Sequence, residues 1–106
     1  MRNALSREIR ASLIKNFMHM LFLFQLDKSP MGGYDVIKFF YEKYNLLFSP
    51  GTIYSCLYSM ERDGLVKGMG NQNKRIYKLT DKGRAMLNAF RNDKEELLKF
   101  ISDMLR

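Results

Sequence analysis

The chain has 106 residues, a length that suits one domain with one modest core, and its 46% hydrophobic and 13% aromatic residues exclude a disordered protein. The 18 lysines and arginines outnumber the 11 aspartates and glutamates, and the net charge of +7 favours a polyanionic partner, either nucleic acid or an acidic membrane surface. A single cysteine and a single histidine exclude an intramolecular disulfide and a structural zinc site, so we expect no metal, no cofactor and a reducing, cytoplasmic setting.

Residues 5–26 are predicted to form one long helix, because apolar residues recur every three or four positions and neither glycine nor proline interrupts them. Nine of the thirteen residues from Ile14 to Leu26 are apolar, which is too many for one buried stripe. A second burial surface is therefore implied, and we expect Phe17, Leu21 and Phe24 to lie in a dimer interface.

The same apolar run follows several basic residues and so resembles a signal peptide. His19 and Gln25 within the run, and the lack of a small-residue cleavage motif after it, argue against that interpretation. The sequence also has no stretch approaching the ~18 apolar residues of a membrane span. We expect no membrane segment.

Pro30 and two glycines end the first helix, and residues 34–45 predict a second, shorter helix that stops at Asn45. A third helix is predicted from Pro50 to about Asp63, with Ser49 as its N-cap and Gly64 closing it.

The third helix separates into two faces on a helical wheel. Its apolar arc consists of Ile53, Cys56, Leu57 and Met60. The opposite arc has no acidic residue at its centre and is rich in hydrogen-bond donors; it holds Gly51, Ser55, Tyr58, Ser59 and Arg62, with Thr52 and Tyr54 on its flanks. This pattern is typical of a DNA recognition helix.

Because Thr52 and Tyr54 lie outside the apolar arc, substituting either is expected to leave the fold intact. We expect Cys56 to be a packed core thiol and His19 a hydrogen-bonded interface residue.

Residues 65–79 predict a two-stranded hairpin that contains basic residues but no carboxylate. Three helices followed by a basic hairpin is the order of a winged helix-turn-helix, in which the third helix enters the major groove and the wing touches the backbone or minor groove. The residues expected to contact DNA are Ser49, Gly51, Thr52, Tyr54, Ser55, Tyr58, Lys67, Asn73, Lys74 and Arg75.

Thr80 and Asp81 begin a last predicted helix that runs nearly to the C-terminus. Its apolar positions, spaced like a short coiled-coil seam, are expected in a dimer interface: Leu87, Phe90, Leu97, Ile101 and Met104. Gly83 and Lys94 interrupt the seam. Because the segment NDKE at 92–95 is itself an N-cap pattern, the helix either continues through it or restarts there.

Three segments closely resemble the PadR family of winged-helix transcriptional regulators: GGYDVIKFF, SPGTIYSCLYSMERDGLV and KRIYKLTDKGRAML, which together span about residues 32–87. The resemblance implies a homodimer joined by its N- and C-terminal helices, bound to a pseudo-palindromic operator and often acting as a repressor. It also implies that Thr52 and Tyr54 lie at the DNA surface. Where many members have Pro-Leu-Leu, this chain has Ser55, Cys56 and Leu57, which adds a hydroxyl to the polar side of the third helix.

Members of this family can bind aromatic or drug-like ligands between subunits. The chain has no tryptophan to stack on such a ligand, so a small-molecule effector stays an open possibility.

The sequence therefore predicts one mainly α domain, 1–106, with a small β-wing: an N-terminal interface helix (1–26), a winged helix-turn-helix core (27–79) and a C-terminal dimerisation helix (80–106). The expected function is dimeric, sequence-specific binding of double-stranded DNA to regulate transcription. A winged-helix protein-binding module without DNA affinity is the alternative, and binding to a membrane surface is a third. One histidine, one cysteine and no glycine-rich phosphate loop argue against an enzyme.

Overall fold

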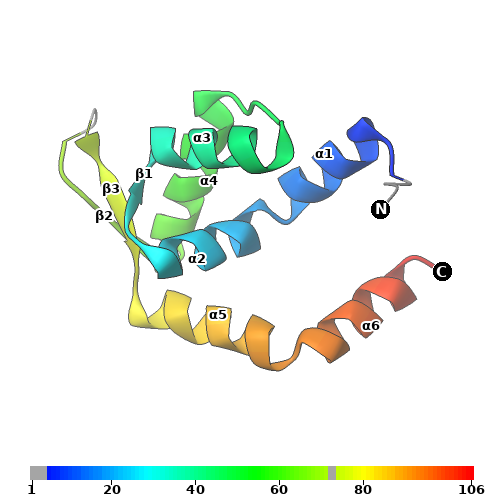
Figure 1. The fold of residues 1–106 in the computed structure, drawn as a ribbon. Helices are drawn as coiled ribbons and strands as arrows, with labels where there is room; N and C mark the ends of the chain where they lie inside the picture. Colours follow the sequence, from blue (N-terminus) through cyan, green and yellow to red (C-terminus); the bar gives the residue numbers. More distant parts are fainter. Residues whose placement is uncertain (1–4, 72–73) are drawn as a thin grey trace.

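The computed structural model describes residues 5–71 and 74–106 and shows a helical core with a small sheet at one side (Figure 1). The helices are α1 (Arg7–Asn16), α2 (Met18–Lys28), α3 (Gly33–Tyr44), α4 (Pro50–Arg62), α5 (Asp81–Asn92) and α6 (Lys94–Met104). The strands are β1 (Met31–Gly32), β2 (Val66–Met69) and β3 (Ile76–Leu79). The chain therefore has the predicted mainly α, winged-helix architecture. In Figure 1, α1 and α6 extend as two arms away from the sheet, on the same side of the molecule.

The prediction of one uninterrupted N-terminal helix is wrong at Phe17, where φ is −99° and ψ is 15° and α1 gives way to α2. Hydrogen bonds still cross the break, because the Phe17 N–H donates to the Leu13 carbonyl and the Leu21 N–H donates to the Phe17 carbonyl, each at 3.0 Å. The two halves have different surroundings. Every residue of α1 is exposed or half-buried, whereas α2 buries Phe22, Leu23 and Leu26. The chain bends where its burial changes.

The core lies where α2, α3, α4, α5 and the sheet meet. Its fully buried side chains include Phe22, Phe40, Ile53, Leu57, Met60, Tyr77 and Leu87. Leu87 was predicted in a dimer interface, and its complete burial places it in the protomer core instead, which corrects that expectation. Gly83 interrupts the predicted seam for a related reason: a β-carbon at this position would collide with the Leu65 carbonyl.

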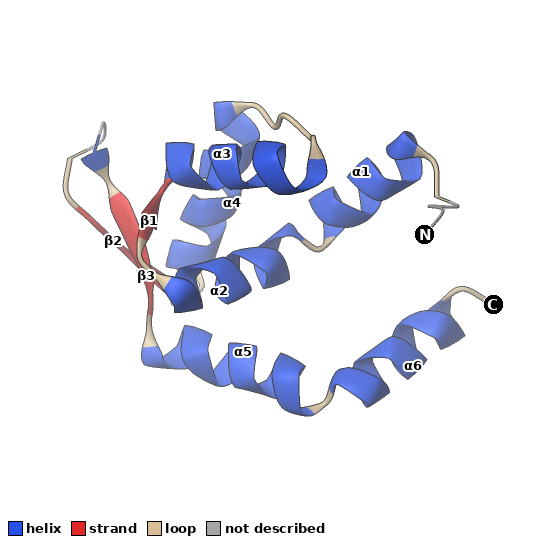
Figure 2. Ribbon diagram, in the orientation of Figure 1, coloured by secondary structure: helices blue, strands red, loops and turns tan. Residues whose placement is uncertain are grey.

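The sheet has three strands in the order β1-β3-β2, all antiparallel, so the prediction of only two strands is corrected (Figure 2). The added strand is the pair Met31–Gly32, which lies opposite Tyr77 and Ile76 of β3. This two-residue strand contains Gly32 and is followed by Gly33, which is the sequence of a loop, and it is a strand only because it pairs with the distant β3. We call the β2–β3 hairpin the wing.

The C-terminal segment forms two helices rather than one, because Asp93 leaves the helical region with φ −111° and ψ 30°. Thr80 caps α5 as predicted, its hydroxyl accepting a hydrogen bond from the Gly83 N–H at 3.0 Å. Asp27 of α2 fastens α5 to the core, with its carboxylate oxygens 2.7 Å from Arg84 and 2.9 Å from Arg91.

Candidate nucleic-acid interface

The start of α4 is well defined and open to solvent. The Ser49 hydroxyl accepts a hydrogen bond from the Thr52 N–H at 3.2 Å and lies 3.0 Å from the Thr52 hydroxyl. Pro50 occupies the first turn, where its missing N–H costs nothing. Because Ser49 and Gly51 are both exposed, the positive end of the helix can be approached by an anion.

The two predicted faces of α4 are confirmed. Ile53, Leu57 and Met60 are completely buried and Cys56 is 8% exposed. The opposite side exposes Ser55, Tyr58 and Arg62, with Thr52 half-buried beside them. This exposed face offers hydroxyl groups and a guanidinium, which can donate to phosphates and to base edges.

Tyr54 is held more tightly than its place on the wheel indicated. Its ring lies so close to Gly33 of α3 that a β-carbon there would collide with it. The ring also packs edge-on against Tyr34 at a centroid distance of 6.3 Å and lies 5.9 Å from the Tyr58 ring. Burial raises the pKa of the Tyr54 phenol above its usual value. Tyr54 therefore contacts both α3 and α4, and its removal is expected to cost some stability although it lies outside the apolar arc.

Tyr34, Tyr54 and Tyr58 form a row of three tyrosine rings. The sequence did not single out Tyr34 as part of the site. This residue stands at the beginning of α3 and is 66% exposed. Its sequence signal was its position directly after Gly32 and Gly33, and that position does not reveal that the ring meets Tyr54.

Arg75 was predicted as a phosphate contact, but a carboxylate already engages it. Its guanidinium lies 2.7 Å from Glu61 of α4 and 5.7 Å from the centroid of the Tyr77 ring. The hydrogen bond to Glu61 raises the pKa of Arg75. Glu61 also accepts a hydrogen bond from the Gly68 N–H at 3.1 Å. Arg75 thus fixes the wing to α4 and offers less charge to DNA than the acid-free hairpin sequence indicated.

The exposed charge of the wing comes from its lysines. Lys67 of β2 and Lys78 of β3 are cross-strand partners, and both are exposed, as is Lys74 near the hairpin tip. Next to the lysine pair, Met69 and Ile76 are also partners and are each 43% exposed. Asn73, a further predicted contact, lies outside the described residues.

Cys56 is a core thiol, as expected. Burial raises its pKa to about 12, and its Sγ lies 3.6 Å from His19 Nδ1. Across residues 5–71 and 74–106, no three histidine, cysteine or acidic side chains converge as metal ligands. None of the helices described combines the length and apolar character needed to cross a membrane.

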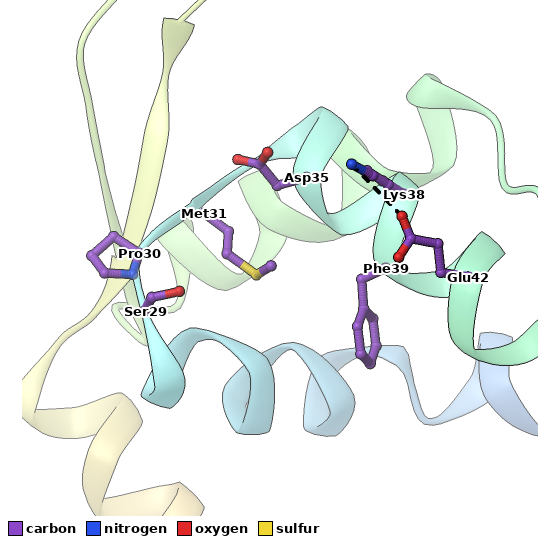
Figure 3. Close-up of a pocket in the computed structure, with 7 residues that line it drawn as sticks. All are labelled: Ser29, Pro30, Met31, Asp35, Lys38, Phe39 and Glu42. Carbon is purple, nitrogen blue, oxygen red and sulfur yellow. Dashed lines mark ion pairs between the residues drawn. The ribbon is translucent and has the colours of Figure 1, made fainter.

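A separate hollow of about 460 Å³ lies between the end of α2, β1 and α3 (Figure 3). Its charged groups have partners within the fold. Asp35 accepts a hydrogen bond from the Gly32 N–H at 2.8 Å, and Lys38 lies 3.7 Å from Glu42. With two carboxylates in its lining, this hollow does not suit nucleic acid.

Seven of the eight residues predicted in a dimer interface remain at least partly accessible. Phe17, Leu21, Phe24, Phe90, Leu97 and Ile101 are half-buried, and Met104 is 60% exposed. Every residue of α6 is exposed or half-buried, as in α1, and the exposed apolar side chains on the two arms include Ile9, Leu13, Leu98 and Phe100.

Comparison with known proteins gives a consistent result. Residues 22–89 match the family described as the transcriptional regulator PadR-like family. A PadR-like transcriptional regulator from Bacillus cereus is 20% identical, with a TM-score of 0.71 over 90% of this chain and 97% of the other. A PadR family transcription regulator from Clostridium difficile is 24% identical, with a TM-score of 0.68 over 85% of this chain and 99% of that one. A comparison with curated proteins finds no match.

Proposed function

Because the chain belongs to the PadR-like family of transcriptional regulators, we propose that it is a homodimeric repressor that binds a pseudo-palindromic operator in double-stranded DNA. In this proposal α4 enters the major groove, with Thr52, Ser55 and Tyr58 near base edges or phosphates. Lys67, Lys74 and Lys78 of the wing contact the backbone. A DNA partner also favours a cytoplasmic location.

The observation that carries the proposal is the Lys67–Lys78 pair on the outer face of the wing. Like charges directly opposite each other in a sheet destabilise it. Both side chains are exposed, and neither forms an ion pair among the residues described. A polyanion across this face would relieve the repulsion and gain two charge-assisted contacts. The fold thus keeps an unfavourable pair where a phosphate backbone would make it favourable.

The homodimer is supported by the two arms. The helices α1 and α6 carry exposed apolar side chains that one protomer leaves accessible, and contiguous surfaces of this kind mark association sites. Pairing about a two-fold axis would present two copies of α4, which matches an operator with two half-sites.

The exposed Met69–Ile76 pair favours a second candidate, a protein-binding winged helix. Apolar side chains on an outer sheet face are unusual in a surface dedicated to phosphates. Lys67 and Lys78 contact DNA phosphates in the first candidate and do not in the second.

The test begins with selection of bound sequences from a random duplex pool, followed by fluorescence-anisotropy titrations on selected and scrambled duplexes at several salt concentrations. Lys67→Gln and Lys78→Gln should weaken binding to both duplexes. Each should also flatten the slope of log K against log salt by about 0.9 per lost phosphate contact, or about 1.8 for a dimer.

The matched control is Lys99→Gln, which makes the same charge change on α6, far from the wing (Figure 1). It should leave the slope near that of the parent. Unchanged slopes in both wing variants would place the wing off the DNA and favour the protein-binding candidate.

A further inference from the structure

A second basic surface lies beside α4, in a hollow of about 320 Å³ between that helix and the junction of α1 and α2. Lys15 of α1 and Arg62 of α4 contribute its charge. Thr52, Ser55 and Ser59 of α4 line it with hydroxyl groups, and His19 lies beside them. Cationic side chains and hydroxyl groups both donate hydrogen bonds to phosphate oxygens, so this lining suits a phosphate group.

The charge of this hollow is uncompensated. The described residues that line it include no carboxylate. Lys15 and Arg62 are exposed, and neither forms an ion pair within the described part of the chain. In contrast, Arg75, Arg84 and Arg91 each lie within 2.9 Å of a carboxylate oxygen. Lys15 and Arg62 therefore differ from the arginines that hold the fold together.

The hollow and the wing lie on opposite flanks of α4. One flank of α4 faces α3 and the wing through Tyr54 and Glu61. The other flank, with Thr52 and Ser59, faces the hollow. A helix seated in the major groove, which is about 12 Å wide, has a phosphate backbone on each side. If the wing meets one backbone, the other passes along the flank that carries Lys15 and Arg62.

We infer that this hollow binds a DNA backbone phosphate on the side of α4 away from the wing, with Lys15 and Arg62 supplying charge and the α4 hydroxyls donating hydrogen bonds. The inference rests on the proposed DNA binding and adds a contact from α1 to it. An arm proposed to hold two protomers together would then also touch the DNA, so the angle between the arm and α4 would decide whether both backbones are reached.

The experiment measures binding of the full chain to a 30-base-pair duplex of random sequence, because phosphate contacts carry no sequence information. Anisotropy titrations at several salt concentrations compare the parent with Lys15→Gln, Arg62→Gln, Lys67→Gln and the control Lys99→Gln. Lys15→Gln and Arg62→Gln should each flatten the salt slope by about 0.9 per protomer bound, and Lys15→Arg should restore it.

A double variant separates the two basic surfaces. Lys15 and Lys67 lie on different sides of α4, so their effects on the slope should add in Lys15→Gln/Lys67→Gln. Ser59→Asp, which introduces a carboxylate into the hollow without touching α1, should weaken binding at least as much as Lys15→Gln. Ser102→Asp on α6 is its control.

The possible failures are distinguishable. If Lys67→Gln flattens the slope while Lys15→Gln, Arg62→Gln and Ser59→Asp do not, this inference is overturned and the proposed function stands. If the parent itself shows no salt-dependent binding to any duplex, the proposed function fails first.

Discussion

Tyr54 packs against α3, and we expect the same side chain to contact DNA. Because its ring lies on Gly33, Tyr54→Ala should lower the free energy of unfolding by roughly 1–3 kcal/mol, less than the loss at a fully buried aromatic residue. Tyr54→Phe keeps the ring and should retain most of the stability while losing the hydroxyl. Urea unfolding followed by circular dichroism measures both variants, and DNA titration then shows what the hydroxyl contributes.

Two reference variants complete this test. Leu57→Ala truncates a completely buried side chain and should cost about 2–5 kcal/mol. Thr52→Ala removes a half-buried hydroxyl near the helix start and should cost much less. Equal unfolding midpoints for Tyr54→Ala and the parent would show that the ring contributes no stability at the α3–α4 contact.

The Cys56 thiol should be protected from alkylation. Its pKa of about 12 leaves very little thiolate at pH 8, and the thiolate is the reactive species. Modification by N-ethylmaleimide should be at least ~100-fold slower in the native protein than in urea, where the thiol returns to its usual pKa of about 8.5. Mass spectrometry of timed samples measures the two rates, and equal rates would contradict the burial of this side chain.

Among the elements, α5 depends on Asp27 for its attachment to α2. The hydrogen bond from Arg91 and the charges of Arg91 and Arg84 hold the Asp27 pKa below its usual 3.8. Because the Asp27 pKa is lower in the folded than in the unfolded protein, the charged carboxylate stabilises the fold at pH values above its pKa in the unfolded chain. That stabilisation is lost as the pH falls through its pKa in the folded protein. Asp27→Asn should therefore lower the melting temperature at pH 7, and its difference from the parent should shrink below about pH 4.

Asp103→Asn provides the control for this pH series. Asp103 pairs with Arg106 at 3.9 Å on the exposed end of α6, where such a pair contributes little. Melting curves from pH 3 to 7 should overlay those of the parent. A constant difference for Asp27→Asn across the whole pH range would mean that its effect does not come from the charge.

Elements whose ends are set by local chemistry could be predicted from sequence. Asn45 ends α3 in the left-handed region at φ 56°. Ser49 and Pro50 begin α4, and Thr80 begins α5, in each case through contacts within a few residues. The apolar arc of α4 was predictable for the same reason, since helical periodicity alone determines it.

Features created by contacts between distant parts of the chain were not predictable. The bend at Phe17 follows a change in burial, and β1 exists because β3 pairs with it. The Arg75–Glu61 ion pair and the contact of Tyr54 with Gly33 join residues from different elements. Leu87 has the spacing of a seam residue, but the approach of α5 to Leu65 turns it into the core. In the candidate interface, the exposed face of α4 was therefore predictable, and the partners of Arg75 and Tyr54 were not.

At the scale of the whole molecule, the arms predict a dimer. Light scattering at low micromolar concentration should give twice the 12.5 kDa mass of one chain. A chain ending at Asn92 lacks α6, which contributes no fully buried side chain among the described residues, so it should keep its helical core yet run as a monomer. Removing only Leu105 and Arg106 should change neither property. A dimer that survives loss of α6 would exclude that arm from the interface.

The pairing of β1 with β3 also has a consequence for the order in which the chain folds. The β2–β3 hairpin joins neighbouring segments and can form early, whereas β1 must meet β3 across the intervening α3 and α4. Closing that long loop costs chain entropy, which is offset only after α3 and α4 have packed against the core. We expect the β1 pairing to form last and to open first. Amide exchange at Met31, which pairs with β3, should then be faster than at Lys78, which pairs with Lys67 within the hairpin, so the sheet would come apart from its β1 edge while the hairpin stays intact.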